Sequence, residues 1–373
     1  MTDHATPTAE RTERLTDQLR RVVARADRAR GKRDLPSAQV LVTAPGFEFA
    51  SGDRARRFHS ASVGKLVTAI RAMQLAETGA LDLDAPVTEL LPGAEWRGLF
   101  VVDGRDRARE ATPWHLLTHT SGVADYFEGR ADTGIPFERE IADHPDRRWS
   151  PDDLLDYTRR HQRPVGVPGG RFSYSDTGYV LLARILEEAG GASLGEQFHR
   201  DVFAPTGMTE SALLFHTLPG GAPSTSATPA ADLDIAPLWI GRAELSRATS
   251  LSCDWGGGGV VTTLDDLDRL LAAWGAGRLV PASVRDRMIA GNGRFRPGIR
   301  YGAGAMTVRY GGLSPFLFGM PHAHGHLGVT AAHAFRVPQA GVNVVLNLHS
   351  TREMVRSFRL HIDLVRKTVA ALR

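Results

Sequence analysis

The segment Phe58-His-Ser-Ala-Ser62-Val-Gly-Lys65-Leu-Val-Thr-Ala places a lysine three residues after a serine. The chain has 45 basic residues, and only Lys32, Lys65 and Lys367 are lysines. Arginine stays protonated in proteins, whereas a buried lysine can lose its proton and act as a base. A lysine at this position of an arginine-rich chain therefore indicates a chemical requirement that arginine does not meet.

The residues after Ser62 predict a helix over 63–78, with apolar residues on one face and a glycine at its end. Lys65 then lies one turn beyond Ser62 on the same side, within reach of its hydroxyl. The helix N-terminus also brings backbone N–H groups close to a developing oxyanion. In the alternative interpretation, Ser62 is a helix cap and Lys65 a solvated side chain.

Two further stretches carry candidate catalytic residues. Residues 168–183 read Pro-Gly-Gly-Arg-Phe-Ser-Tyr174-Ser-Asp176-Thr-Gly-Tyr-Val-Leu-Leu-Ala, and residues 324–330 read His-Gly-His326-Leu-Gly328-Val-Thr. With Ser62 and Lys65 they resemble the three motifs of the penicillin-recognising serine hydrolases. That family contains class C β-lactamases, D,D-carboxypeptidases, D-aminopeptidases, β-lactamase-like esterases and some acyltransferases.

The resemblance continues outside the motifs, over about residues 37–350, and includes His-Leu-Leu-Thr-His-Thr-Ser-Gly at 115–122. It implies an α/β (α+β) fold of the serine β-lactamase type. We expect an antiparallel sheet flanked by N- and C-terminal helices, with a mostly helical insert. Residues 1–10 are expected to be disordered and 11–373 to form one β-lactamase-like domain. Its sheet subdomain would comprise about 11–100 and 290–373, and its helical subdomain about 101–289.

The resemblance also implies the roles of the motif residues. Ser62 is the nucleophile that forms an acyl-enzyme, and Lys65 and Tyr174 share the general-base work. His326 would hydrogen-bond Tyr174 or the substrate. The backbone N–H groups of Ser62 and Val329 would form the oxyanion hole, and Gly328 would let its strand approach the substrate closely.

Asp176 departs from the family pattern, which usually has Asn at this position. An ionised carboxylate only accepts hydrogen bonds and favours the ammonium form of a nearby lysine. Asp176 therefore has three interpretations: a helix cap, a group that binds a substrate amine or shifts the base role toward Tyr174, or a mark of altered activity. Two aromatic residues are predicted to line the pocket, Tyr126 on one edge and Trp255 on the opposite wall.

Three classes of function follow. The first is a serine hydrolase or acyltransferase that acts on a small ester, amide or short peptide. The second is a β-lactamase, a D,D-carboxypeptidase or a D-aminopeptidase. The third is a non-catalytic binding protein on the same fold. The acyl group, the leaving group, the choice between water and another acceptor, and the oligomeric state stay open.

Composition excludes other classes of function. The net charge is only +3, and no basic run with interleaved aromatic residues indicates nucleic-acid binding. No apolar run approaches the roughly 20 residues of a membrane span, and no signal peptide is recognisable, so a cytoplasmic location is expected. No cofactor is expected. His322, His324 and His326 alternate as zinc ligands on a strand would, but they lack an acidic partner, so no metal is predicted.

Other elements are predicted from periodicity and capping residues. Helices are expected from Leu15, after Thr112-Pro113, from Asp176 or Thr177, over 264–274 behind Thr263, and at the C-terminus. Strands are expected at Ala38–Val42, Tyr301–Arg309, Ala331–Val337 and Val342–Leu348. Leu218–Pro237 is rich in Pro, Ser, Thr and Gly and is expected to be irregular.

Overall fold

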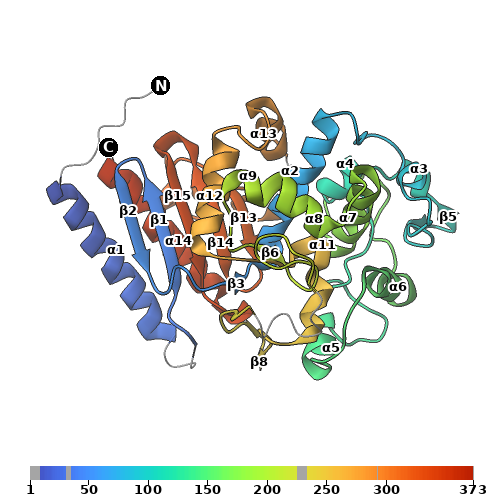
Figure 1. The fold of residues 1–373 in the computed structure, drawn as a ribbon, viewed down its shortest axis with the longest axis horizontal. Coiled ribbons are helices and arrows are strands. Elements are labelled where there is room, and N and C mark those ends of the chain that lie inside the picture. The colour runs from blue at the N-terminus through green and yellow to red at the C-terminus, as the bar shows by residue number, and fades with distance from the viewer. Residues whose placement is uncertain (1–8, 31–34, 225–232, 292, 373) are drawn as a thin grey trace.

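An eight-stranded antiparallel sheet organises the computed structural model, which describes residues 9–30, 35–224, 233–291 and 293–372. Its strand order is β10-β11-β12-β13-β14-β15-β1-β2 (Figure 1). Since β1 pairs with β15, strands from the two ends of the chain are neighbours within one sheet. The strands are β1 (Gln39–Ala44), β2 (Phe47–Ser51), β10 (Gly293–Arg296), β11 (Ile299–Tyr301), β12 (Met306–Val308), β13 (Ala323–Gly328), β14 (Ala332–Val337) and β15 (Val342–Asn347).

Helices cover both faces of this sheet, and the side chains on both faces are therefore apolar. Side chains alternate between faces along a strand, and in β1 Val40 and Val42 join one apolar cluster while Leu41 joins the other. Helices α1 (Ala9–Arg30) and α14 (Met354–Leu372) pack against each other and contribute to the first cluster. Helix α12 (Leu264–Gly275) contacts β1, β14 and β15 from the second side.

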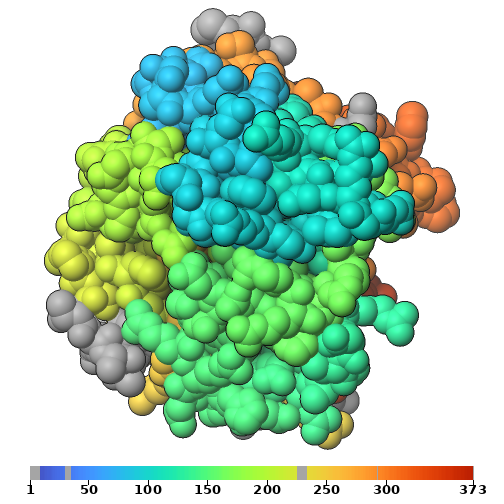
Figure 2. Space-filling view, turned by 90° about the vertical axis from the view of Figure 1, so that its right-hand side faces the viewer, coloured from blue at the N-terminus to red at the C-terminus, as the bar shows by residue number. Residues whose placement is uncertain are grey.

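The rest of the chain forms a mostly helical half around α2 (Gly64–Glu77), which contacts α7 and α11. Helix α2 is buried on nearly all sides, so it is a core helix. Figure 2 shows this half face on, and the segments coloured light blue, green and yellow make up most of the visible surface. Its helices are α3 (Val87–Leu90), α4 (Pro113–Leu117), α5 (Phe137–Asp143), α6 (Pro151–His161), α7 (Asp176–Gly190), α8 (Leu194–Phe198), α9 (Ala204–Thr206), α11 (Trp255–Gly258) and α13 (Ala282–Ile289).

Short strands complete the helical half. A three-stranded sheet has the order β3-β9-β6, and β4–β5 and β7–β8 are separate pairs. Their bounds are β3 (Phe58–His59), β4 (Val101–Val102), β5 (Arg105–Asp106), β6 (Ala212–Leu213), β7 (Trp239–Ile240), β8 (Ala243–Glu244) and β9 (Val260–Thr262). Strand β3 leads directly into the serine segment, so the β3–β9 pairing anchors one end of that segment.

The predicted fold class and most helix starts are confirmed. The Thr112 side chain accepts a hydrogen bond from His115 N, and the Thr263 side chain accepts one from Asp266 N. One predicted strand is wrong: Tyr301–Arg309 contains the end of β11 and all of β12, which pair with each other. The turn between them is closed by a hydrogen bond from Gly302 N to Ala305 O of 2.8 Å.

Some predictions lie partly outside the described residues. Of the expected disordered segment 1–10, residues 1–8 are not described, and the last two begin α1. The expected irregular segment Leu218–Pro237 includes 225–232, which are also not described; the isolated bridge between Thr217 and Pro223 marks its start. Within the described ranges, no helix has both the length and the apolar character that a bilayer crossing requires.

Candidate active site

Ser62 lies on a 3₁₀ turn, Ala61–Val63, immediately before α2. The preceding Ala61 has a φ of +48°, a left-handed conformation that costs an L-residue roughly 1–2 kcal/mol. A side chain at Gly258 would approach the carbonyl oxygen of Ala61 to 2.6 Å, so the glycine is needed for this close packing. The chain therefore holds the serine in a strained turn with its side chain facing a cavity.

Lys65 is completely buried and its three ammonium donors have three acceptors. Nζ lies 3.1 Å from Ser62 Oγ and 2.6 Å from Gly257 O, and its third contact is with Asp176 Oδ1. The Asp176 carboxylate compensates a charge that would otherwise be costly without water. The predicted proximity of Ser62 and Lys65 is thus present, and the alternative of a solvated lysine is wrong.

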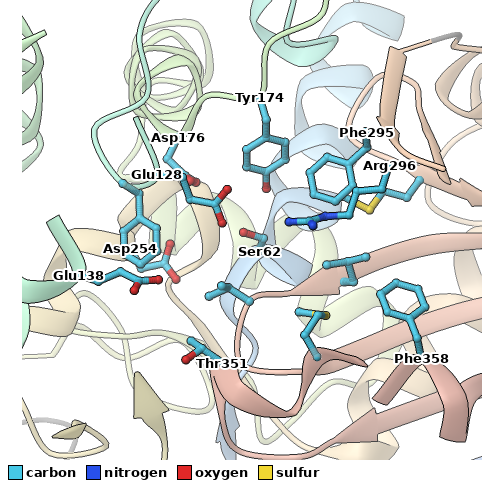
Figure 3. Close-up of a pocket in the computed structure, with 15 residues that line it drawn as sticks. Ser62, Glu128, Glu138, Tyr174, Asp176, Asp254, Phe295, Arg296, Thr351 and Phe358 are labelled. Carbon is cyan, nitrogen blue, oxygen red and sulfur yellow. The ribbon is translucent and has the colours of Figure 1, made fainter. Parts of the chain in front are cut away.

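Tyr174 belongs to the loop before α7 and its ring lies 5.0 Å from Lys65 Nζ. Burial and the nearby Asp176 carboxylate raise the pKa of Tyr174 well above its usual value, and a hydrogen bond with Ser62 opposes this shift. The hydroxyl is therefore neutral near pH 7 and lies beside Ser62. Figure 3 shows it directed toward Ser62.

Asp176 is the first residue of α7, but it does not cap that helix. The cap is Ser175, whose side chain accepts from Gly178 N at 3.1 Å. The Asp176 side chain instead contacts Lys65 and lines the cavity, and its backbone N–H donates to Asp125 Oδ1 at 3.0 Å. The capping interpretation of Asp176 is therefore wrong.

His326 does not make the expected hydrogen bond to Tyr174. Its Nδ1 lies 2.8 Å from Leu327 O, and its Nε2 lies 3.2 Å from the hydroxyl of Tyr301. Burial, with a smaller effect of the Lys65 charge, lowers the pKa of His326 to about 3. This imidazole is therefore neutral and fully buried. Its hydrogen bond with the Tyr301 hydroxyl connects it to the aromatic residues that surround the site.

Gly328 and Val329 lie where strand β13 meets the serine turn. A side chain on Gly328 would collide with the carbonyl oxygen of Ser60, so the glycine permits close packing against the serine segment. Gly328 was expected to let its strand approach the substrate, but it lies outside the described cavity lining and packs against the serine segment instead. Val329 does line the cavity together with Ser62, in agreement with a shared oxyanion hole.

The two aromatic residues predicted to form pocket walls lie in the core instead. The Tyr126 hydroxyl donates to Cys253 O at 2.6 Å, and its ring packs 5.1 Å from that of Phe137. Trp255 is also buried, with the guanidinium of Arg184 5.5 Å from its ring. Both fall outside the described residues that line the cavity, because their side chains point into the helical half.

The cavity at Ser62 has a volume of about 310 Å³ and two chemically different sides. Figure 3 shows the carboxylates on one side of Ser62, and Phe295, Arg296 and Phe358 on the other. The acidic residues are Glu128, Glu138, Asp176 and Asp254. The remaining lining residues are Phe127, Met306, Leu327, Val329, Thr351 and Met354, besides Ser62 and Tyr174.

Burial raises the pKa of Glu128, Glu138 and Asp254, so these three side chains resist ionisation. Burial raises the pKa of Asp254 to about 7, Lys65 opposes this shift, and the Asp176 charge adds to it. Burial and then Asp176 likewise raise the pKa of Glu128. Asp254 approaches His59 Nε2 at 3.8 Å, but burial lowers the pKa of His59 to about 4, so that imidazole is neutral. A cation placed on this side would relieve the repulsion.

Most of these lining residues were not predicted from the sequence. The loop that contains Val123, Asp125, Tyr126 and Phe127 was expected at the pocket edge; Phe127 does line the cavity, and Glu128, which follows it, was not predicted. Met354 and Phe358 belong to the C-terminal helix, where the apolar pattern indicates only core packing. The pattern does not show which turn of that helix faces the cavity.

The three alternating histidines do not form a common site. His324 Nδ1 lies 2.9 Å from the hydroxyl of Thr307, and His326 is directed toward Tyr301. Across the described residues, no group of three His, Cys, Asp or Glu side chains is arranged to hold a metal ion. The histidine pattern therefore reflects strand pairing and core contacts.

Comparison with known proteins agrees with this geometry. The family model described as Beta-lactamase matches residues 19–369. Penicillin-binding protein 4 of Amycolatopsis lactamdurans is 31% identical over 205 residues, covering 51% of this chain and 48% of the relative. Esterase EstB of Burkholderia gladioli is 35% identical over 157 residues, covering 41% of this chain and 37% of the relative.

A solved structure extends the likeness to nearly the whole fold. The D-amino acid amidase of Ochrobactrum anthropi SV3, solved with D-phenylalanine, has a TM-score of 0.75 and 20% sequence identity to this chain. The similarity covers 96% of this chain and 99% of the amidase. These curated relatives are matched over less than half of their own length.

Proposed function

Because this chain belongs to the Beta-lactamase family, we propose that it is a serine hydrolase or acyltransferase that works through an acyl-Ser62 intermediate. The observation that carries the proposal is the hydrogen-bonded group of Ser62, Lys65 and Tyr174 at the wall of a cavity of about 310 Å³. A small ester, amide or short peptide is the substrate class. A cytoplasmic location stays a prediction.

The reaction begins with attack of Ser62 Oγ on the substrate carbonyl. Lys65 first passes one ammonium proton to the Asp176 carboxylate that it contacts, so that its free amine, together with Tyr174, takes the serine proton as the Oγ–C bond forms. The pair then gives this proton to the leaving group as the bond between the leaving group and the carbonyl carbon breaks. The backbone N–H groups of Ser62 and Val329 stabilise the tetrahedral oxyanion. Water or a second nucleophile then attacks the acyl-enzyme, and the same two side chains return the proton to Ser62.

The cavity favours substrates that carry an ammonium group. Glu128, Glu138 and Asp254 lie on one side of Ser62, and within the described ranges no Lys or Arg is recorded within ion-pair distance of them. An ammonium group there makes charge-assisted hydrogen bonds and lowers the repulsion among the carboxylates. The apolar side chains across the cavity accept a hydrophobic group on the other side of the scissile bond.

The alternative is a β-lactamase or a D,D-carboxypeptidase. Substrates of both carry a carboxylate, which the four acidic side chains of the lining repel, and the buried His326 is neutral. Arg296, on the other side of the cavity, is the lining residue that a substrate carboxylate would have to use. A D-aminopeptidase or an amino acid amidase, the activity for which the Ochrobactrum anthropi relative is named, acts on a free amine and fits the cavity better. A non-catalytic binding protein is the remaining alternative.

The first experiment follows acylation of the wild type and Ser62→Ala. The protein is incubated with a short-chain p-nitrophenyl ester, a D-amino-acid p-nitroanilide and a chromogenic cephalosporin, and release and intact mass are recorded. We expect ester or anilide turnover with a covalent adduct in the wild type and neither in the variant, because Ser62 Oγ, 3.1 Å from Lys65 Nζ, is the hydroxyl that the variant removes. Turnover by Ser62→Ala would refute the assignment, and cephalosporin turnover alone would favour the lactamase.

A second experiment tests the charge preference with one amine substrate and its N-acetylated, neutral analogue. Glu128→Gln and Glu138→Gln should each raise KM for the amine about two- to fivefold, as expected for partly exposed ion pairs, and leave KM for the neutral analogue unchanged. Glu140→Gln is the matched control, since Glu140 shares helix α5 with Glu138 but lies outside the described lining. Equal changes for both substrates would contradict the charge preference.

A further inference from the structure

We infer that His119 is a positioning residue for Tyr174, whose ring it holds against Ser62 through its imidazole and its backbone carbonyl. The inference rests on the proposed function, in which Tyr174 exchanges a proton with Ser62. His119 follows α4 in the loop that packs against the Tyr174 segment. It lies outside the described cavity lining, so it acts through Tyr174 rather than on the substrate.

His119 accepts hydrogen bonds from the residues on both sides of Tyr174. Ser173 N donates to the His119 carbonyl oxygen at 2.8 Å, and Ser175 N donates to His119 Nδ1 at 3.1 Å. The backbone of Tyr174 is therefore held on both sides by one residue. Since Nδ1 accepts a hydrogen bond, the proton of the neutral ring is on Nε2.

The imidazole keeps this acceptor over the working pH range. His119 is 1% exposed, and burial, followed by the charge of Lys65, lowers its pKa well below the usual value. A protonated ring would lose the acceptor for Ser175 N. Neutral His119 thus provides the same hydrogen bond at acidic and neutral pH.

The ring of His119 also forms one side of an aromatic enclosure around Tyr174. Its centroid lies 4.2 Å from that of Tyr174, with the planes inclined by 34°. It also lies 4.5 Å from Tyr301 and 5.1 Å from Tyr179. A tyrosine in contact with a ring at this distance has little freedom to swing away from Ser62.

The backbone of His119 is held in an unfavourable conformation. Its φ of +55° lies in the left-handed region, which residues with an L side chain seldom adopt. Hydrogen bonds from His119 N to Leu116 O and from Thr120 N to His115 O maintain the turn. An asparagine would adopt this backbone conformation with less strain. The imidazole ring is therefore the feature that histidine contributes at this position.

Two variants separate the contributions of the acceptor and the ring. His119→Asn suits the left-handed backbone and keeps a short side-chain acceptor, but it removes the ring. His119→Phe keeps a ring of similar size and removes the acceptor for Ser175 N. Each should lower the rate of Ser62 acylation about 10- to 100-fold with KM changed less than about twofold, because misplacement of a catalytic group affects the chemical step. His115→Asn, on helix α4, is the matched control.

A double-mutant cycle with Tyr174→Phe distinguishes positioning from general destabilisation. If His119 acts through the Tyr174 hydroxyl, His119→Asn slows acylation in the wild-type background and has little further effect when Tyr174 is Phe. Acylation is followed by intact mass with an activated p-nitrophenyl ester, and thermal unfolding verifies that each variant is folded.

The inference would be overturned by wild-type acylation rates in both His119 variants, by equal losses of rate in the two backgrounds, or by a wild-type rate in Tyr174→Phe alone. Failure of the proposed function is a separate result, because it is read from turnover by Ser62→Ala. A His119 variant whose KM changes by a larger factor than its acylation rate would also contradict a positioning role.

Discussion

At the scale of single residues, the fit around Ser62 depends on glycines as much as on the reacting groups. Gly257 provides the carbonyl acceptor for Lys65 Nζ at 2.6 Å. A Cβ at this position would lie 2.7 Å from Asp176 Oδ1 and 3.3 Å from Lys65 Nζ. The absence of a side chain therefore leaves room for the buried ion pair.

Gly257→Ala should lower kcat by about 100-fold or more, because the new methyl group displaces the lysine from Ser62 by a fraction of an ångström to 1 Å. The fold should survive with a loss of roughly 1–3 kcal/mol in unfolding free energy. Steady-state kinetics and urea denaturation measure the two effects. Gly166→Ala is the control, since its Cβ would meet no atom within 4 Å; similar losses in both variants would contradict the steric argument.

The motifs predicted which residues would meet, but not all of their contacts. Ser62, Lys65 and Tyr174 come together because one helix turn and one loop place them around the same point. The expected Tyr174 partner of His326 was wrong because the His326 side chain on β13 reaches past β12 to Tyr301 of β11, and the sequence does not give that geometry. Trp255 was misplaced since a short helix points it inward.

At the scale of elements, the C-terminal helix is joined to the sheet side of the molecule by buried polar contacts. His361 Nε2 on α14 lies 2.8 Å from the Tyr310 hydroxyl, and the two rings stack with planes inclined by 16°. Burial lowers the pKa of His361 to about 3. The helix therefore docks with a neutral imidazole at its interface.

This contact makes part of the stability dependent on pH. The unfolded chain protonates His361 near pH 6.5, whereas the folded chain resists protonation, so the contribution is complete above pH 6.5 and is lost as the pH falls toward 3. At pH 5 the loss from this group is roughly 2 kcal/mol. His361→Gln keeps an oxygen acceptor for Tyr310 and should weaken the pH dependence by that amount.

Urea denaturation of the wild type and His361→Gln at pH 7.5 and pH 5 measures this difference. His144→Gln is the matched control, since His144 lies in an exposed position at the end of α5 and should leave the pH dependence unchanged. An identical pH dependence in wild type and His361→Gln would show that the imidazole is not protonated on unfolding in this range.

Element boundaries were predictable where a local side chain decides them. The caps at Thr112 and Thr263 are short-range hydrogen bonds, so the sequence shows them directly. The division of Tyr301–Arg309 into β11 and β12 depends instead on a turn at 302–305, which the even apolar pattern conceals. Helix α2 was expected to have one apolar face, but other helices bury it on nearly all sides.

At the scale of the whole molecule, the order of elements and the family resemblance predicted the antiparallel sheet with an inserted helical half. The shape and charge of the cavity were not predictable. Glu128 and Glu138 come from the helical half, whereas Met354 and Phe358 come from the last helix. These residues come together only through the packing of the two halves, and a local sequence pattern does not predict that packing.

The pairing of β1 with β15 has a consequence for the order in which the chain becomes active. During synthesis, Ser62 leaves the ribosome long before Val329 and before the strand that ends at Asn347. Until β13–β15 are made, the serine turn has no strand edge to close against, and Ser62 lacks Val329, its partner in the proposed oxyanion hole. We therefore expect the proposed acylation competence to be acquired late, after long-range strand pairing of the kind that folds slowly.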